Sequence, residues 1–269
     1  MRSAIEEWLA YCRRNNSPET VDRYQRILWQ FCAHSGDKAL TALTVAHVEQ
    51  YIDTLLHRGH GHNTCNTHLA AVKSFWSWET RRHGTPNIAA AVPRLTPDDP
   101  VQRFLSEEEY ARVLAICGPV AKDLVQLYGN TGLRRGEMLR LRWPHVAPDM
   151  RALRVPHGKG NKARTVPVNG VCRDILSRNR VDDTFSFLLR YGSPSGQDRL
   201  CGRLAGQAAI PPFGPHALRH YFATRMIRAG IPLKIVSKIL GHSSVAITEK
   251  IYCHLMPVDL LGTTESLSM

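Results

Sequence analysis

The sequence has no long apolar segment and no paired cysteines. None of its hydrophobic runs approaches the roughly 18 residues of a transmembrane helix, and the N-terminus lacks the pattern of a signal peptide. The seven cysteines are scattered, without a CxxC pair, which argues against a zinc site or a disulfide framework. We therefore expect no membrane association, and we predict a protein of the reduced cytoplasm.

Acidic residues are also few. The chain has 35 Lys and Arg against 23 Asp and Glu, a formal net charge of +12, which points to a polyanionic partner such as nucleic acid or an anionic membrane surface. Because no membrane segment is present, nucleic acid is favoured. Residues 1–100 hold 11 basic and 10 acidic side chains, whereas residues 101–269 hold 24 and 13. We expect the tighter phosphate contacts in the second part.

One histidine-rich segment, residues 57–62, could suggest a metal site. It has three histidines, but its other residues are arginine and glycine, so the segment itself supplies no cysteine or carboxylate to complete a ligand set. The glycines are typical of a loop. We expect this loop to face solvent or phosphate, and we predict no metal centre.

A proline-rich stretch divides the chain. Three prolines within residues 93–100 cannot continue a helix, so we predict a linker over residues 93–103 between domains at 1–92 and 104–269. Before it, apolar residues at helical spacing predict helices that begin near Ser17, Thr44 and Thr64. After it, Ser106 followed by three glutamates is typical of a helix start.

The second domain has the pattern of a mixed structure. Leu153 and Val155 alternate with polar residues, a Gly-Lys-Gly-Asn-Lys turn follows at residues 158–162, and extended chain resumes at Arg164, which predicts a β-hairpin. We therefore expect an α+β fold, mainly helical with one small hairpin. Lys162 and Arg164 on this hairpin are predicted to make nonspecific phosphate contacts.

Several segments of the second domain carry basic or nucleophilic residues in a fixed order. Arg134 opens a helix, and Glu137 on the same face could orient its guanidinium. His216 and Arg219 leave one face of a helix that ends at Gly230. Three more residues complete the series: a lysine between two glycines, a histidine directly after a Leu-Gly helix end, and a tyrosine ten residues later. The full series is Arg134, Lys159, His216, Arg219, His242 and Tyr252.

With these motifs the chain resembles the tyrosine recombinases of the phage integrase family. The resemblance implies that two arginines clamp a DNA phosphate, that Tyr252 attacks it to form a 3′-phosphotyrosyl bond, and that Lys159 protonates the leaving 5′-oxygen. It also implies that His216 is the acid/base and that His242 hydrogen-bonds the phosphate. Such chemistry conserves the phosphodiester energy and needs no cofactor.

The resemblance extends to architecture and partners. It implies an all-helical core-binding domain, in which Lys73 and Arg81 could touch phosphate, and a Xer-like form without a separate arm-binding domain. It also implies duplex DNA with inverted-repeat sites, a homotetramer linked by exchanged C-terminal tails, Holliday-junction exchange and possible accessory proteins. The sequence also allows a transposon-encoded or prophage recombinase. Two other functions stay open as alternatives: a type IB topoisomerase and a catalytically silent DNA-binding protein.

Overall fold

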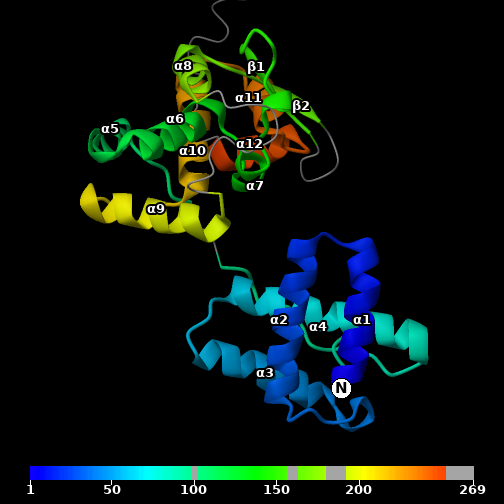
Figure 1. The fold of residues 1–269 in the computed structure, drawn as a ribbon. Helices are drawn as coiled ribbons and strands as arrows, with labels where there is room; N and C mark the ends of the chain where they lie inside the picture. The colour runs from blue at the N-terminus through cyan, green and yellow to red at the C-terminus, as the bar shows by residue number, and fades with distance from the viewer. Residues whose placement is uncertain (99–101, 157–162, 180–191, 253–269) are drawn as a thin grey trace, which may run out of the picture. The chain divides into compact units, whose positions relative to one another are not determined.

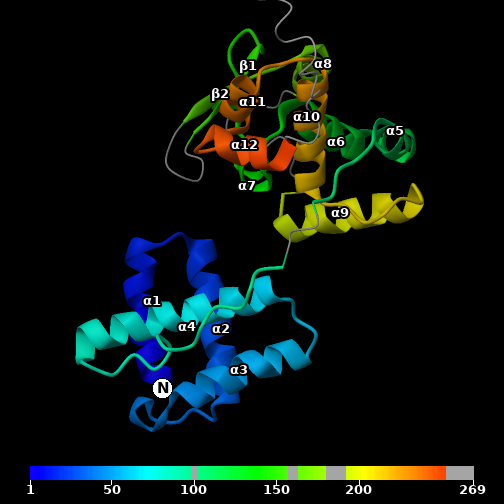
Figure 2. The same ribbon diagram turned by 180° about the vertical axis from the view of Figure 1, so that it is seen from behind.

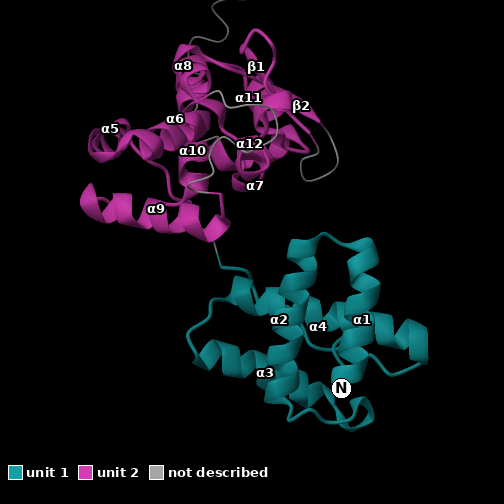
Figure 3. Cartoon of the chain, viewed as in Figure 1, with its two compact units in different colours: residues 1–101 teal, residues 102–269 magenta. Residues whose placement is uncertain are grey.

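The chain forms two compact units, Met1–Val101 and Gln102–Met269 (Figure 3). The structure is a computed structural model, and it describes residues 1–98, 102–156, 163–179 and 192–252. Each unit has a hydrophobic core of its own. Among the described residues, no helix combines the length and apolarity needed to cross a membrane.

The N-terminal unit is a helical bundle (Figure 1). Its elements are α1 (Arg2–Asn15), α2 (Pro18–His34), the 3-10 turn η1 (Leu40–Ala42), α3 (Val45–His57) and α4 (His62–His83). The Ser17 hydroxyl accepts a hydrogen bond from the Thr20 amide, and Pro18 occupies the first helical position, so local chemistry starts α2 as predicted. The buried stripe of α3 also lies at its predicted positions. α1, in contrast, was not predicted as a separate helix.

The first half of the expected linker belongs to the N-terminal unit. The Asn66 side chain on α4 pairs with the backbone of Leu95: its Nδ2 donates to the Leu95 carbonyl at 2.8 Å, and its Oδ1 accepts from the Leu95 amide at 3.0 Å. The Asp98 carboxylate accepts from the Asn63 amide at the start of α4 at 3.1 Å. Residues 93–98 are therefore held on α4 and do not run free from residue 92.

The C-terminal unit holds the other elements. They are α5 (Glu107–Ile116), α6 (Pro119–Thr131), α7 (Arg135–Leu139), the 3-10 turn η2 (Trp143–His145), β1 (Ala152–Val155), β2 (Arg164–Pro167), α8 (Gly170–Arg178), α9 (Pro194–Gln207), α10 (Pro215–Arg228), α11 (Leu233–Leu240) and α12 (Val245–Tyr252). α10 packs on α6, and α12 lies against α11 (Figure 2). β1 and β2 pair antiparallel, with Val155 opposite Arg164.

These elements confirm the expected fold class, which is mainly helical with one small hairpin. The Ser106 start of α5 is a capping box, in which Ser106 and Glu109 each bind the other's backbone amide. α7 begins directly after Arg134, as predicted, and is a short helix that ends at Leu139. α8 and α9 were not predicted, because their apolar residues are interrupted by glycine and polar side chains.

The Asn66 side chain gives a test of the docked segment. Asn66→Ala removes both hydrogen bonds and leaves two backbone groups of Leu95 unpaired, which costs on the order of 1–3 kcal/mol. We expect faster tryptic cleavage after Arg94, measured by mass spectrometry of timed digests. Thr67→Ala, an exposed change one residue further along α4, serves as the control. Equal cleavage rates in the two variants would contradict the prediction.

Candidate active site

The C-terminal unit brings five of the six predicted catalytic residues onto neighbouring element ends. Arg134 is the residue before α7, His216 and Arg219 stand on α10, His242 follows the end of α11, and Tyr252 ends α12. Lys159 lies outside the described residues, as do Lys162 and the predicted exchange tail after residue 252.

The C-terminal end of α11 organises three arginines. Its last turn offers carbonyl oxygens that have no partner within the helix. The acceptors, each paired with one guanidinium, are Ile239 with Arg164 at 2.7 Å, Leu240 with Arg219 at 2.8 Å, and Gly241 with Arg134 at 2.6 Å. Cations are also favoured at this end of the helix dipole. A helix terminus thus holds together charges that would otherwise repel one another.

Arg219 is anchored at both ends of its guanidinium. Besides the Leu240 bond, its Nη1 donates to the carbonyl of Gly132 at 2.6 Å, and the residue is only 4% exposed. Burial, and then the charge of Arg134, lowers the pKa of Arg219 to about 9. The group still carries its charge at neutral pH. A buried cation presented in this way is suited to an anionic ligand.

Glu137 supplies the buried counter-charge. Its carboxylate binds the Arg134 guanidinium at 3.0 Å and amide at 2.8 Å, which confirms that Glu137 orients Arg134. It also accepts two hydrogen bonds from Arg164, both at 2.7 Å. Burial alone would raise the pKa of Glu137, but the bonds from Arg164 and Arg134 outweigh it and bring the pKa to about 2. The carboxylate is therefore ionised throughout the neutral range.

The expected role of Arg164 needs correction. We predicted a nonspecific phosphate contact, but its side chain is 9% exposed and its guanidinium is occupied by Glu137 and the α11 carbonyl. The reason is position: Arg164 is the first residue of β2, and β2 packs on α11. Arg164 is a structural member of the site.

Two glycines allow these close contacts. Gly241 has a φ of +69°, in the left-handed region, and a Cβ there would lie 2.9 Å from the Arg164 side chain. Gly132 has a φ of +62°, and a Cβ there would collide with the ring of Phe222. Any other residue would be strained in both places and would displace a side chain of the cluster.

Tyr252 is buried beside the arginines. It is 1% exposed, and burial raises the pKa of its phenol. Its hydroxyl lies 2.6 Å from Nδ1 of His220. Burial, followed by the charges of His216 and Arg219, lowers the pKa of His220 to about 4, so this imidazole is neutral at pH 7. In the tautomer that carries its hydrogen on Nε2, the phenol donates this hydrogen bond and Nδ1 of His220 accepts it.

The two other histidines differ in their surroundings. Nδ1 of His242 lies 2.8 Å from the hydroxyl of Thr248, and burial together with Arg219 and Arg134 lowers its pKa to about 4. Burial and then Arg219 also lower the pKa of His216. Among the residues that the structure describes, none forms a hydrogen bond with the His216 ring. His216 thus lies near the arginines, and within the described residues its ring forms no hydrogen bond with the phenol hydroxyl.

His220 and Thr248 were missed from the sequence. His220 directly follows Arg219, and this adjacency was the available signal. One residue along a helix turns the side chain by about 100°, which directs the two residues to different neighbours. Thr248 lies four residues before Tyr252 on α12, where a lone threonine carries no functional pattern. Only the packing of α12 on α11 shows its role.

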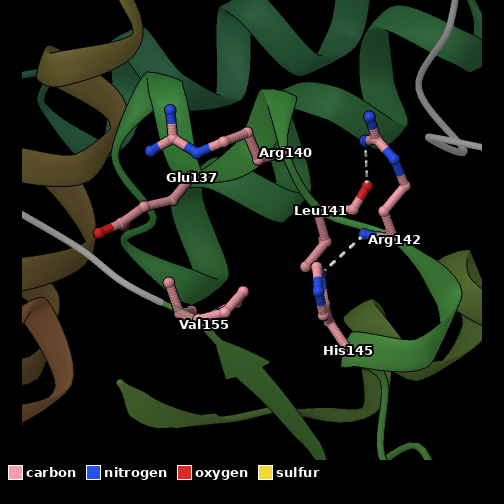
Figure 4. Close-up of a pocket in the computed structure, with 7 residues that line it drawn as sticks. Glu137, Arg140, Leu141, Arg142, His145 and Val155 are labelled. Atoms are coloured by element: carbon pink, nitrogen blue, oxygen red, sulfur yellow. Dashed lines mark hydrogen bonds between the residues drawn. The ribbon is translucent and has the colours of Figure 1, made fainter. Parts of the chain in front are cut away.

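Glu137 also lines a hollow of about 360 Å³ (Figure 4). It is lined by Glu137, Arg140, Leu141, Arg142, His145, Val155 and Pro156. The Arg142 amide donates to Nδ1 of His145 at 3.1 Å. Glu137 alone is shared with the arginine cluster, so this hollow is separate from the Tyr252 site.

Lys73 and Arg81 stand on α4, in the N-terminal unit. The Lys73 ammonium donates weakly to the Ala90 carbonyl at 3.4 Å, and Arg81 is exposed. Within the described part of the chain, no group of three or more histidine, cysteine or acidic side chains is arranged to hold a metal ion.

Arg164→Ala tests whether this arginine stabilises the site from within. Glu137 would keep only Arg134 as a charged partner in a buried place, and breaking a buried ion pair costs on the order of 3–5 kcal/mol. Urea unfolding measures the loss. Arg154→Ala, an exposed change on β1 of the same hairpin, should stay within about 0.5 kcal/mol of the unmodified protein. Similar losses in both variants would refute the assigned role.

Acid unfolding tests the Glu137 pairing. Because the folded pKa is about 2 against an ordinary value near 4.5, the ionised carboxylate stabilises the fold above pH 4.5, and that stability is lost as pH falls toward 2. The change amounts to roughly 3 kcal/mol. We expect Glu137→Gln to have a lower free energy of unfolding at neutral pH and to lose less of it between pH 4.5 and 2. Glu249→Gln, an exposed change, should lose as much stability in this pH range as the unmodified protein.

Comparison with known proteins agrees with this geometry. The model of the phage integrase family matches residues 103–257, and that of the phage integrase N-terminal SAM-like domain matches residues 5–83. Tyrosine recombinase XerC of Mycobacterium bovis (strain BCG / Pasteur 1173P2) is 29% identical over 270 residues, covering 89% of this chain and 88% of the relative. XerC of Xanthomonas axonopodis pv. citri (strain 306) is 28% identical, covering 94% and 92%.

Solved structures share the fold. The integrase of transposon Tn1549, in complex with transposon right end DNA, matches with a TM-score of 0.77 and 19% identity over 99% of this chain and 98% of that one. A lambda integrase dimer bound to a COC′ core site matches with a TM-score of 0.75 and 17% identity over 92% and 96%. Since the family model spans more than half of the chain, the protein belongs to the phage integrase family and is a tyrosine recombinase, an enzyme of site-specific DNA recombination.

Proposed function

We propose that this recombinase breaks and rejoins DNA strands through a 3′-phosphotyrosyl intermediate on Tyr252 and exchanges them through a Holliday junction. The observation that carries the proposal is the position of Tyr252 at the end of α12, packed on α11, whose terminal carbonyls hold Arg134 and Arg219. The proposed nucleophile and the two proposed phosphate-binding arginines are thus all held against α11.

The two arginines neutralise the phosphate. Each uses part of its guanidinium on protein oxygens, and each has further N–H groups that these bonds do not use and that can bind the nonbridging oxygens once the site opens. Because both guanidiniums are already oriented, little rotamer entropy is lost when the phosphate binds. Removal of one preorganised donor to a developing oxyanion typically costs about 3–4 kcal/mol of transition-state stabilisation.

The other proposed roles rest on the family resemblance. The resemblance has Lys159 protonate the leaving 5′-oxygen and gives the acid/base role to His216. We propose that His242 binds the phosphate, with its ring held through Thr248. The transesterification conserves the energy of the phosphodiester, so neither ATP nor a metal ion has a role in our proposal.

Access to Tyr252 requires a change on binding. The side chain is 1% exposed, so its hydroxyl cannot meet a phosphate in this arrangement. We infer that the surroundings of Tyr252 open when DNA binds.

The proposed partner is duplex DNA that carries inverted-repeat recombination sites. The two relatives solved with transposon-end or core-site DNA support a DNA partner. Lys73, Arg81 and Lys162 are proposed phosphate contacts, with the N-terminal unit as the core-binding domain and the C-terminal unit as the catalytic domain. A homotetramer on DNA with an exchanged tail, accessory proteins, and a cytoplasmic, nucleoid-associated location also stay proposals. The matched relatives are recombinases, so a topoisomerase or a silent DNA-binding protein is not favoured.

Tyr252→Phe tests the proposed nucleophile. The substrate is a duplex site that this protein selects from random-sequence DNA, nicked a few nucleotides from the cleaved phosphate so that the short fragment is lost. We expect unmodified protein to form a covalent adduct, visible on denaturing gels, and Tyr252→Phe to bind the duplex without forming one, because only the hydroxyl is removed.

Tyr110→Phe is the matched control. Tyr110 is also a buried tyrosine of the C-terminal unit, and no described residue forms a hydrogen bond with its hydroxyl. We expect this variant to form the adduct at the normal rate. An adduct that persists in Tyr252→Phe would show that another residue attacks the phosphate.

A further inference from the structure

His220 occupies the position at which the phenol proton of Tyr252 must leave. Its Nδ1 lies 2.6 Å from the hydroxyl, and this is the one hydrogen bond that Tyr252 Oη makes with the described residues. The two side chains come from different helices, α10 and α12, and are 32 positions apart in the chain. The short distance is a result of tertiary packing.

The surroundings hold the imidazole in this place. The ring of Phe104 lies 5.2 Å from that of His220 and 6.0 Å from that of Tyr252, centroid to centroid. A neutral imidazole carries its hydrogen on one nitrogen only, and when that nitrogen is Nε2, Nδ1 accepts the hydrogen bond from the phenol. This tautomer has a lone pair directed at the phenol hydrogen, which is what proton acceptance requires.

We propose that His220 is a further catalytic residue, the general base that removes the proton of Tyr252 during strand cleavage and returns it during resealing. The inference rests on the proposed function, because it takes Tyr252 as the nucleophile. It differs from the family-based expectation, which gives the acid/base role to His216.

The step balances as follows. The O–H bond of Tyr252 breaks and its proton passes to Nδ1 of His220, while Oη forms a bond to phosphorus and the bond from phosphorus to the 5′-oxygen breaks. The leaving oxygen takes a proton from the general acid, for which Lys159 is proposed. On resealing, the 5′-hydroxyl attacks phosphorus and gives its proton back to Lys159, the bond from phosphorus to Oη breaks, and the departing phenolate recovers its proton from His220.

DNA binding would strengthen this base. The groups that act on the His220 ring are His216 and Arg219 on its own helix, Tyr252 on α12, and His242 after α11. In the free protein, Arg219 opposes protonation of His220. A phosphate bound to Arg219 would offset that charge and raise the pKa of His220. The imidazole is therefore a weak base at rest and a stronger one when substrate is present.

His220→Asn separates a base from a simple hydrogen-bond acceptor. The Asn amide oxygen can stand near the place of Nδ1 and accept from the phenol, but it cannot take the proton. We expect single-turnover adduct formation on the nicked duplex to slow by about 10²- to 10⁴-fold, the usual contribution of general base catalysis. Equilibrium binding of the duplex and the thermal unfolding midpoint, measured on the same preparations, report whether the fold is retained.

The pH profile distinguishes the base from a positioning role. In the unmodified protein the rate should rise with pH and then level off as His220 loses its proton in the complex. In His220→Asn it should keep rising, because hydroxide must then deprotonate the phenol. His216→Asn, the matched variant four residues earlier on α10, should keep the plateau. In His220→Ala, added imidazole should restore part of the rate.

A measurement on the unmodified protein makes the test independent of mutant folding. Nitrogen-15 NMR of labelled histidine should show His220 as the Nε2–H tautomer in the free protein. Protonated Nδ1, a normal rate and pH profile in His220→Asn, or loss of the plateau in His216→Asn alone would each overturn the proposal. These results leave Tyr252 as nucleophile, whereas an adduct in Tyr252→Phe would overturn both proposals.

Discussion

The site depends on the last carbonyls of α11. A helix leaves these oxygens without partners, and a buried helix end must find donors elsewhere. Here three guanidiniums supply them, from Arg134, Arg164 and Arg219. Each arginine is held at the helix terminus that favours positive charge. The same contacts bring residues from the hairpin, α10 and the start of α7 to one place.

Glu137 makes this concentration of charge tolerable. A single buried carboxylate binds two of the three arginines, while Arg219 is held by carbonyl oxygens alone. The cluster therefore keeps an excess of positive charge where the phosphate is proposed to bind. That excess explains why the nearby imidazoles of His220 and His242 are neutral, since protonation would add charge to an already cationic site.

The basic residues differ in role because they differ in how they are packed. Arg164 and Arg134 are both bound to Glu137 and to α11, yet their side chains differ in exposure, at 9% and 26%. Arg164 supports the site from within, and Arg134 is one of the two proposed phosphate ligands. Among the histidines, His220 is hydrogen-bonded to the Tyr252 hydroxyl, and His242 is hydrogen-bonded to Thr248. Residue type alone does not distinguish these roles.

The sequence by itself determined what local chemistry controls. The Ser17 and Ser106 helix starts, the left-handed glycines, the hairpin pairing and the order of arginines, histidines and tyrosine could all be predicted, and with them the family. α8 and α9 were missed because glycine and polar side chains interrupt their apolar residues, so that contacts with other elements, more than the local pattern, stabilise them. Only the tertiary structure decided which groups meet: Arg134 binds a carbonyl 107 positions away, and His220, not His216, contacts Tyr252. These pairings result from how α10, α11 and α12 pack together, and no periodicity within one segment carries that information.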